Sequence, residues 1–470
     1  MKRLALIGLV IVLFKYSSGY ESLLYFERSW YDSLSSSGIT NSLEVNPVRL
    51  LYTNNNDSSV IGLYLHNTNF GYKREYDPES VFEFGLIYRN YKTLSDKNII
   101  SSRIYYCQFD YLKLGRSLEK SFYDNYFSII DTTVGNVSYN GPVLSFADLY
   151  RWRGGLIAGF LINYGIERGL KDVYTKCETI ARNFDSSIGV GFKGKRINSS
   201  VYFRYLNNQR KYEAVKEYQD ALIRTFYGFH IYKIEEPGVS KKKDYSSQGW
   251  EIGGGFEYNF FKGWNLNIEY YVGMKEAKIA VNNGSVMKPR GDWVREGYFI
   301  NAGIIKKSGI ISSGLCFYRK EISDWAESSE YKVLILENNM KENFISGSLD
   351  IFFVDRYFGI NVGFGRSNVD YVEYNSKFNS VSTLKKFKIK LNSGLKLKDN
   401  FNLDLNYFIS TFDTDFRWDT DSIFLSQISI VLSKLTIYGS VKTSISLKSY
   451  KPYYSNCRIN TGEVQLMVGI

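Results

Sequence analysis

The segment KKFKIKLNSGLKLK at residues 385–398 decides the fold class of this chain. Its apolar residues Phe387, Ile389 and Leu391 alternate with Lys386 and Lys388. A period of two is typical of a β-strand, because successive side chains leave opposite faces of the backbone. Soluble strands average ~5–6 residues, whereas ~9–11 residues are needed to cross a bilayer at a tilt. We therefore expect a membrane-spanning strand with one face towards lipid and one towards water.

The same alternation recurs along the chain, and short turns alternate with longer polar connections. Working outward from 385–398, we expect spanning strands at 60–71, 81–92, 100–114, 143–152, 156–167, 186–194, 197–206, 248–261, 264–275, 296–307, 309–320, 344–354, 357–368, 385–398, 400–412, 422–432, 435–448 and 458–470. This pattern predicts an all-β protein, an antiparallel up-and-down transmembrane β-barrel of about 18 strands, within a range of 14–18. Its short turns would be periplasmic and its long loops extracellular.

Several connections are expected to be loops on the extracellular side. We place loops at 276–295, 321–343, 369–384, 413–421 and 449–457. The strand-like run at 331–336 would break the alternation of short and long connections, so we expect it within an ordered loop. The longest connection, 207–247, could fold back as a constriction or project outward, and the outward arrangement is the simpler prediction.

The N-terminus has the features of an export signal. Lys2 and Arg3 precede an apolar run from Leu4 to Phe14, and Ser17 and Gly19 supply small residues for cleavage. We expect a signal peptide at 1–19, a periplasmic arm or partial plug at 20–59, and the barrel at 60–470. After residue 19 no apolar run reaches the ~18 residues typical of a membrane helix.

The composition supports a barrel in the outer membrane of a Gram-negative bacterium. The 470 residues include 40 Tyr and 32 Phe but only six Pro, and aromatic residues form girdles at both membrane interfaces of such barrels. A soluble β-sandwich or propeller is the alternative, but it would have shorter strands. The expected partners are the outer-membrane lipid bilayer and the barrel-assembly machinery. The net charge of +11 is spread along the chain, so we expect no nucleic-acid partner.

The inward face of the C-terminal strands suggests a lumen lined by charge. We expect the lumen-lining residues to include Lys386, Lys388, Lys390, Lys396, Lys398, Asp404 and Lys442. Such cations could favour anions in a pore. Alternatively, they could pair with carboxylates and simply hydrate the interior.

The residue types needed for other chemistry are sparse. The chain has two histidines, His66 and His230, and neither has an evident catalytic partner in sequence, so we expect no enzymatic activity. The cysteines lack metal-ligand spacing, so we expect no metal and no cofactor. Export permits disulfides, and Cys177 and Cys457 both fall in expected loops on one side, so they could pair.

Short motifs give the chain a family resemblance. The segment Trp152-Arg153-Gly154-Gly155, the run 168–174, the run 207–211, Phe226-Tyr227-Gly228 and Gln248-Gly249 resemble an uncharacterised outer-membrane β-barrel family of the Bacteroidota. The resemblance implies an outer-membrane barrel and no assigned activity. The chain differs from common porins in its last residue, which is Ile470 rather than an aromatic residue.

Three functional hypotheses follow from the sequence. A porin-like or partner-assisted channel for small solutes is the leading hypothesis. A plugged structural or surface-binding barrel is the alternative, and an outer-membrane hydrolase is a third, weaker hypothesis. A siderophore-type receptor is disfavoured, because its plug and its ~22 strands would not fit this length.

Overall fold

The fold comes from a computed structural model, in which the described residues are 46–48, 57–70, 78–115, 126–131, 133–172, 176–215, 223–228, 230–235, 241–261, 263–283, 285–396, 401–413, 422–436, 439–452 and 459–469. After residue 407 only the backbone of the described residues is given.

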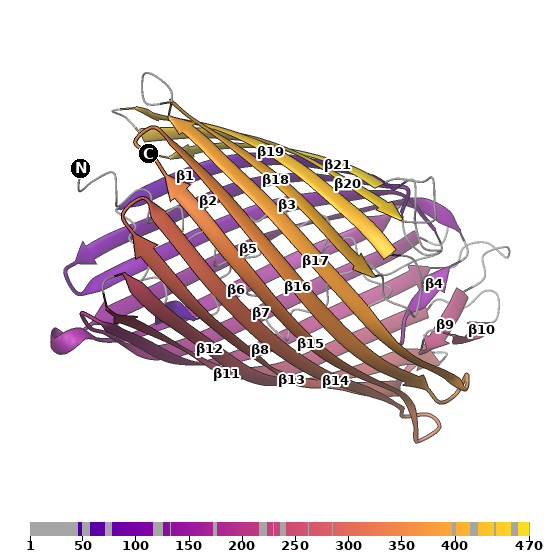
Figure 1. Ribbon diagram of the computed structural model, residues 1–470. Coiled ribbons are helices and arrows are strands. Elements are labelled where there is room, and N and C mark those ends of the chain that lie inside the picture. The colour runs from indigo at the N-terminus through magenta and orange to yellow at the C-terminus, as the bar shows by residue number, and fades with distance from the viewer. Residues whose placement is uncertain are drawn as a thin grey trace.

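Eighteen strands form one antiparallel sheet that closes into a barrel (Figure 1). They are β1 (Ser58–Phe70), β2 (Ser80–Ser95), β3 (Asn98–Gly115), β5 (Val134–Arg151), β6 (Leu156–Lys171), β7 (Lys176–Lys193), β8 (Ile197–Val215), β11 (Lys241–Phe260), β12 (Trp264–Asn283), β13 (Val286–Ser308), β14 (Ile311–Ser328), β15 (Val333–Phe352), β16 (Arg356–Glu373), β17 (Phe378–Lys396), β18 (Phe401–Asp413), β19 (Ser422–Thr436), β20 (Gly439–Pro452) and β21 (Ile459–Gly469). Each strand pairs with its neighbours in sequence, except that β8 pairs directly with β11 and β3 with β5.

Closure of the barrel depends on pairing between the first and last strands. Val60 lies opposite Gly469 at one end of this pair, and Phe70 lies opposite Ile459 at the other. The sheet therefore has no open edge, which satisfies its backbone hydrogen-bonding groups within the protein. This confirms the predicted antiparallel up-and-down barrel. Each of the predicted strands overlaps an observed one.

Short turns join the strands at one end of the barrel, which we call the short-turn end; the opposite end is the long-loop end. The turn between β11 and β12 uses Gly263, whose φ is +88°. A Cβ atom at this position would lie 2.0 Å from the carbonyl oxygen of Lys307. The turn therefore requires glycine for both its backbone angle and its close approach to β13.

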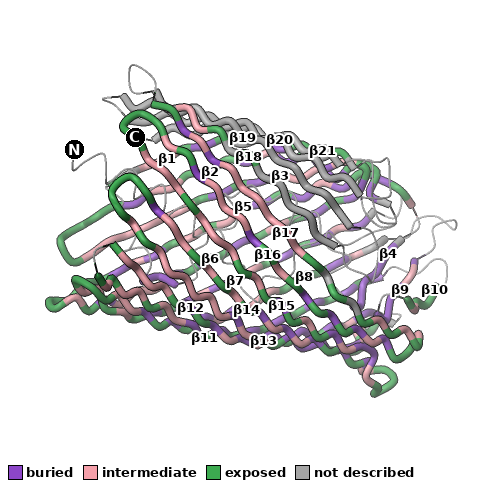
Figure 2. The backbone as a smooth tube through the Cα atoms, in the orientation of Figure 1, coloured by how far each residue is buried: buried purple, intermediate pink, exposed green. Residues whose placement is uncertain are grey.

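Alternation along the strands reverses between the two ends of the barrel. On β12 the outward residues from Trp264 to Met274 are apolar, whereas Glu276 and Lys278 on the same face are polar and exposed. The inward residues change in the opposite sense, because Ala277, Ile279 and Val281 are buried and apolar. Burial along the strands is shown in Figure 2. An apolar outer band therefore covers only the part of the wall nearer the short-turn end.

The predicted loops at 276–295, 321–343 and 369–384 are wrong. Most of these residues belong to strands β12 to β17, which continue beyond the apolar band and meet in tight turns. Likewise, most of the run at 331–336 is the start of β15 rather than part of a loop. Polar outward residues led the sequence prediction to end these strands too early.

The apolar band predicts a strong positional effect of charge on stability. Ile268→Arg places a cation in the middle of the band on β12 and should destabilise the folded barrel by about 2–4 kcal/mol. Ser246→Arg lies on the outer face of β11 beyond the band and should cost no more than about 1 kcal/mol. Urea unfolding of the protein in lipid vesicles measures both. Equal costs at the two positions would contradict the assigned band.

Candidate functional site: the barrel mouth and lumen

A second, smaller sheet lies at the long-loop end of the barrel (Figure 1). We call it the mouth sheet; it consists of β4 (Ile129–Asp131), β9 (Ile223–Tyr227) and β10 (Ile231–Glu235) in the order β10-β9-β4. Its strands are antiparallel. β4 comes from the connection between β3 and β5, and the other two come from the connection between β8 and β11. Two distant connections therefore combine to form one unit.

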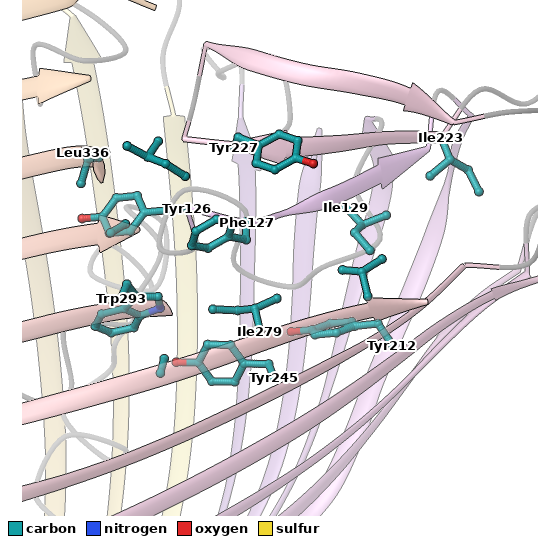
Figure 3. Packing of buried hydrophobic residues seen from close by; sticks show 14 of the residues in the cluster. Tyr126, Phe127, Ile129, Tyr212, Ile223, Tyr227, Tyr245, Ile279, Trp293 and Leu336 are labelled. Carbon is teal, nitrogen blue, oxygen red and sulfur yellow. The ribbon is translucent and has the colours of Figure 1, made fainter. Parts of the chain in front are cut away.

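Apolar packing fixes the mouth sheet against the inner wall (Figure 3). The buried cluster contains Tyr126, Phe127, Ile129, Ile223 and Tyr227 from the mouth, and Cys177, Tyr212, Tyr245, Ala277, Ile279, Val281, Trp293, Ala326, Ile335, Leu336 and Tyr371 from the wall. Gly291 allows the closest approach, since a Cβ atom there would lie 2.1 Å from the ring of Phe127. The cluster explains why the wall residues are apolar on their inner face above the band. The prediction that 207–247 projects outward is wrong for its β9 segment.

Asp324 on β14 connects the wall to the mouth segment by hydrogen bonds. Its Oδ2 accepts from the Tyr126 hydroxyl at 3.1 Å, from Arg295 Nη2 at 2.9 Å and from Asn338 Nδ2 at 3.2 Å. Asp324 is only 2% exposed. A buried carboxylate with several donors is costly to disturb, because losing one donor leaves charge poorly compensated. This network fixes the position of Tyr126 within the mouth.

Two further contacts with the wall hold the residues that precede β4 and the turn between β9 and β10. Lys243 Nζ donates to the Phe127 carbonyl at 2.6 Å from the start of β11. Glu373, at the end of β16, accepts from the backbone N–H of His230 at 3.1 Å, lies 2.8 Å from its ring Nδ1, and accepts from the Tyr371 hydroxyl at 2.8 Å. The ring of His230 also stacks on Phe378, with centroids 4.5 Å apart. The β9–β10 turn is therefore bound to the wall by charge as well as by apolar packing.

Glu373 lies well above the apolar band, which ends at Phe364 on the outer face of the same strand. Burial alone would raise the pKa of Glu373, but hydrogen bonds from His230 and Tyr371 outweigh burial and hold the pKa below its ordinary value. The carboxylate is thus ionised at neutral pH, as its role as acceptor requires.

Charge pairs line the inner wall below the mouth. Lys386 Nζ lies 2.7 Å from Glu342 Oε1, and the same oxygen accepts from the Tyr318 hydroxyl at 2.6 Å. Between the neighbouring strands β7 and β8, Arg204 donates to Asp185 from Nε at 2.8 Å and from Nη2 at 2.7 Å. These pairs compensate charges that would otherwise be costly inside the barrel. The inner face is therefore polar and largely charge-balanced where these groups lie.

The register locates the lysines that the sequence placed in the lumen. Lys386, Lys388 and Lys390 lie opposite Gly365, Gly363 and Asn361 on β16, on the face opposite to Phe387. Lys396 is the last residue of β17 on this same face. Asp404 on β18 accepts from the Tyr357 hydroxyl at 3.2 Å. Lys398 lies outside the described residues, and Lys442 lies in β20, where only the backbone is described.

The cysteine and histidine predictions have different outcomes. Cys177 is buried near the start of β7 rather than in a loop, and it packs in the mouth cluster. Cys457 lies outside the described residues, so the disulfide stays a prediction. His66 is buried on β1, with Nδ1 3.5 Å from Glu83 Oε2. Glu83 is in turn 3.4 Å from the Tyr105 hydroxyl. Both histidines thus have carboxylate partners that sequence separation concealed.

A short N-terminal segment contacts the inner wall. Of the predicted arm at 20–59, the structure describes only 46–48 and 57–59. Val48 is fully buried against Leu149 and Ile157, and Asn46 Nδ2 donates to Ser200 Oγ at 2.9 Å. A Cβ atom at Gly189 would lie 3.2–3.3 Å from atoms of all three residues 46–48. This segment therefore lies inside the barrel, towards the short-turn ends of β5 to β8.

Two other kinds of site can be addressed within the described ranges. No group of three or more His, Cys, Asp or Glu side chains is placed there to hold a metal ion. No helix among these residues is long and apolar enough to span a membrane.

Comparisons with known proteins give structural likeness without a family. No family model and no curated protein matches the chain. Among solved structures, the ferric preacinetobactin receptor BauA of Acinetobacter baumannii has 6% identity and a TM-score of 0.42, covering 88% of this chain and 80% of its own. The alcaligin outer-membrane receptor FauA of Bordetella pertussis has 7% identity and a TM-score of 0.47, covering 87% and 76%. OccAB3 of Acinetobacter baumannii has 9% identity and a TM-score of 0.38, covering 88% and 99%.

The chain is thus similar in structure to outer-membrane barrels, and no family is assigned to it. The resemblance to the Bacteroidota family stays a hypothesis. The contacts of the mouth sheet were not predicted from the sequence, and they are observed in this structure rather than inferred from the comparisons.

The His230–Glu373 contact predicts an acid-sensitive mouth. Because the folded pKa of Glu373 is lowered, its contribution is fully present above the ordinary carboxyl pKa of about 4.3 and is lost as pH falls through the folded value. Glu373→Gln should weaken docking of β9–β10 by about 1.5–3 kcal/mol near neutral pH and remove this acid dependence. Hydrogen exchange of residues 223–235, corrected for intrinsic rates from pH 6 to pH 3, measures both effects. An unchanged acid profile in the variant would contradict the assignment.

Proposed function

We propose that the protein is an outer-membrane channel for small solutes whose extracellular mouth is narrowed by the mouth sheet. A closed barrel with an apolar outer band suits the hydrocarbon layer, where open sheet edges are not tolerated. The short-turn end would face the periplasm and the long-loop end the exterior. We further expect folding to require the barrel-assembly machinery.

The observation that carries the proposal is the coexistence of a charged inner wall with an apolar mouth sheet that packs on part of that wall. Barrels of 16–18 strands can leave an aqueous channel. The part-exposed ammonium of Lys386, which pairs with Glu342, would give such a channel a polar lining. The mouth sheet packs on one arc of the wall, from β7 and β8 through β16. It would thereby restrict solute entry at the exterior.

A surface-binding barrel without transport is the second candidate. The exposed side chains Tyr232 and Ile234 on β10 favour it, since they present apolar surface on the outermost strand of the mouth sheet. Enzymatic activity remains unexpected, because His66 and His230 engage carboxylates within structural networks.

Removal of the mouth sheet should open the channel. Replacing residues 223–235 by a Gly/Ser linker removes β9 and β10, and single-channel conductance in planar bilayers should rise several-fold. As a control, replacing the 374–377 turn by a Gly/Ser turn of equal length should leave conductance unchanged. A parent and variant that both pass no current would overturn the channel proposal and favour the surface-binding barrel.

The inner-wall lysines should influence ion selectivity. Lys388→Glu/Lys390→Glu changes the charge of the β17 inner face by four units and should shift the reversal potential in a salt gradient towards cation preference. Lys242→Glu lies on the outer face of β11 and serves as the control. An identical reversal potential in the parent and the double variant would show that these lysines lie off the conducting path.

A further inference from the structure

Three turns at the short-turn end of the barrel lie next to one another and carry basic side chains. They are the turns 96–97, 152–155 and 194–196, which join β2 to β3, β5 to β6 and β7 to β8. The backbone N–H of Arg151 donates to the Lys97 carbonyl at 2.7 Å, which ties the first two turns together. We call five exposed cations in or beside these turns the basic turn cluster: Lys97, Arg151, Arg153, Lys195 and Arg196.

Two glycines bring the second and third turns together. Gly154 and Gly155 have φ values of +86° and +89°, a backbone region that other residues rarely adopt. A Cβ atom at Gly155 would lie 2.4 Å from the carbonyl oxygen of Lys193, so only glycine permits this approach. The turn 152–155, whose sequence contributes to the family resemblance, therefore lies directly against the turn between β7 and β8.

The apolar outer band ends immediately next to these cations. Leu156 lies opposite Phe192, and both side chains are exposed on the outer face. The ring of Trp152 lies 4.8 Å from that of Tyr150, which also faces outward. Trp and Tyr are typical of the headgroup level of a membrane. Arg153 follows Trp152 directly, so the cluster stands at the level of the lipid phosphates rather than of the acyl chains.

The charge of this region is not balanced by its carboxylates. Asp96 shares a turn with Lys97, and Glu257 on β11 attracts Lys193. Asp148 is half-buried within β5, about 10 Å along the strand from its last residue. Even with Lys193 added to the cluster, six cations thus face three carboxylates. Among the described residues, no carboxylate forms an ion pair with four of these cations, which are Arg151, Arg153, Lys195 and Arg196.

We propose that the basic turn cluster binds an anionic glycerophospholipid of the periplasmic leaflet, whose acyl chains lie on Tyr150, Leu156 and Phe192. Guanidinium and ammonium groups form charge-assisted hydrogen bonds to phosphate oxygens, and each cation near an anionic membrane surface strengthens binding. A lipid fits better than an acidic protein, because the cations adjoin side chains that face the hydrocarbon layer. The inference rests on the proposed placement in the outer membrane, and it is independent of whether the lumen conducts.

Binding can be measured on the full chain in detergent, by titration in native mass spectrometry. The probe is phosphatidylglycerol, which is anionic, and phosphatidylethanolamine with the same acyl chains is the zwitterionic comparison. The parent should bind phosphatidylglycerol at least tenfold more tightly than phosphatidylethanolamine. The double variant Arg153→Gln/Lys195→Gln should raise the Kd for phosphatidylglycerol by tenfold or more. If that variant does not fold, Lys195→Gln/Arg196→Gln tests the same prediction. Glycerol phosphate at the same concentration should not displace the lipid.

The matched control is Lys306→Gln/Arg356→Gln, which also removes one exposed lysine and one exposed arginine near the short-turn end, but from β13 and β16. This control should bind phosphatidylglycerol with the affinity of the parent. Equal weakening in both double variants would reveal only a general charge effect and overturn the site, as would unchanged affinity in Arg153→Gln/Lys195→Gln.

Two further outcomes would overturn the lipid assignment. One is equal affinity of the parent for the two lipids, and the other is displacement of the lipid by glycerol phosphate. Displacement by a poly-glutamate peptide would instead assign the cluster to an acidic protein. The detergent measurement does not depend on conductance, so its failure is distinct from failure of the proposed channel.

Discussion

Pairing of β1 with β21 is the constraint on which the rest of the structure depends. Because the hydrocarbon layer offers no water to hydrogen-bond, a sheet can cross it only when its first and last strands meet. The register from Val60–Gly469 to Phe70–Ile459 achieves this over nearly the whole of β1. Once the sheet is closed, each strand has one face towards lipid and one towards the interior.

The strands extend beyond the band, and there the same alternation serves a different environment. The outer face meets water at Glu276 and Lys278, while the inner face meets the mouth sheet at Ala277, Ile279 and Trp293. The reversal gives the barrel a hydrophobic core at its long-loop end, where the β3–β5 and β8–β11 connections pack against the wall. Asp324 and Glu373 add specific hydrogen bonds, which orient Tyr126 within that core and hold His230 beside Phe378.

Much of the barrel could be predicted because its signal is local. Phe387, Ile389 and Leu391 alternate with lysines in one short segment, and the same pattern located the other spanning strands. The extensions beyond the band were missed because polar outward residues such as Lys278 resemble loop residues when only the lipid-facing pattern is sought. The mouth sheet was missed for a different reason: the Tyr126–Asp324 hydrogen bond joins residues 198 positions apart. Periodicity carries no information about such partners, although the inverted alternation of Ala277, Ile279 and Val281 could have indicated a covered inner face.

The mouth sheet should stay docked against the inner wall when the protein is in a bilayer. Spin labels at Lys233→Cys on β10 and Lys278→Cys on β12, with the native cysteines replaced by alanine, report on this directly. Pulsed electron–electron double resonance in lipid nanodiscs should give one narrow distribution of label-to-label distances for the docked sheet. A broad distribution extending to long distances would show instead that the mouth sheet is not held against the wall.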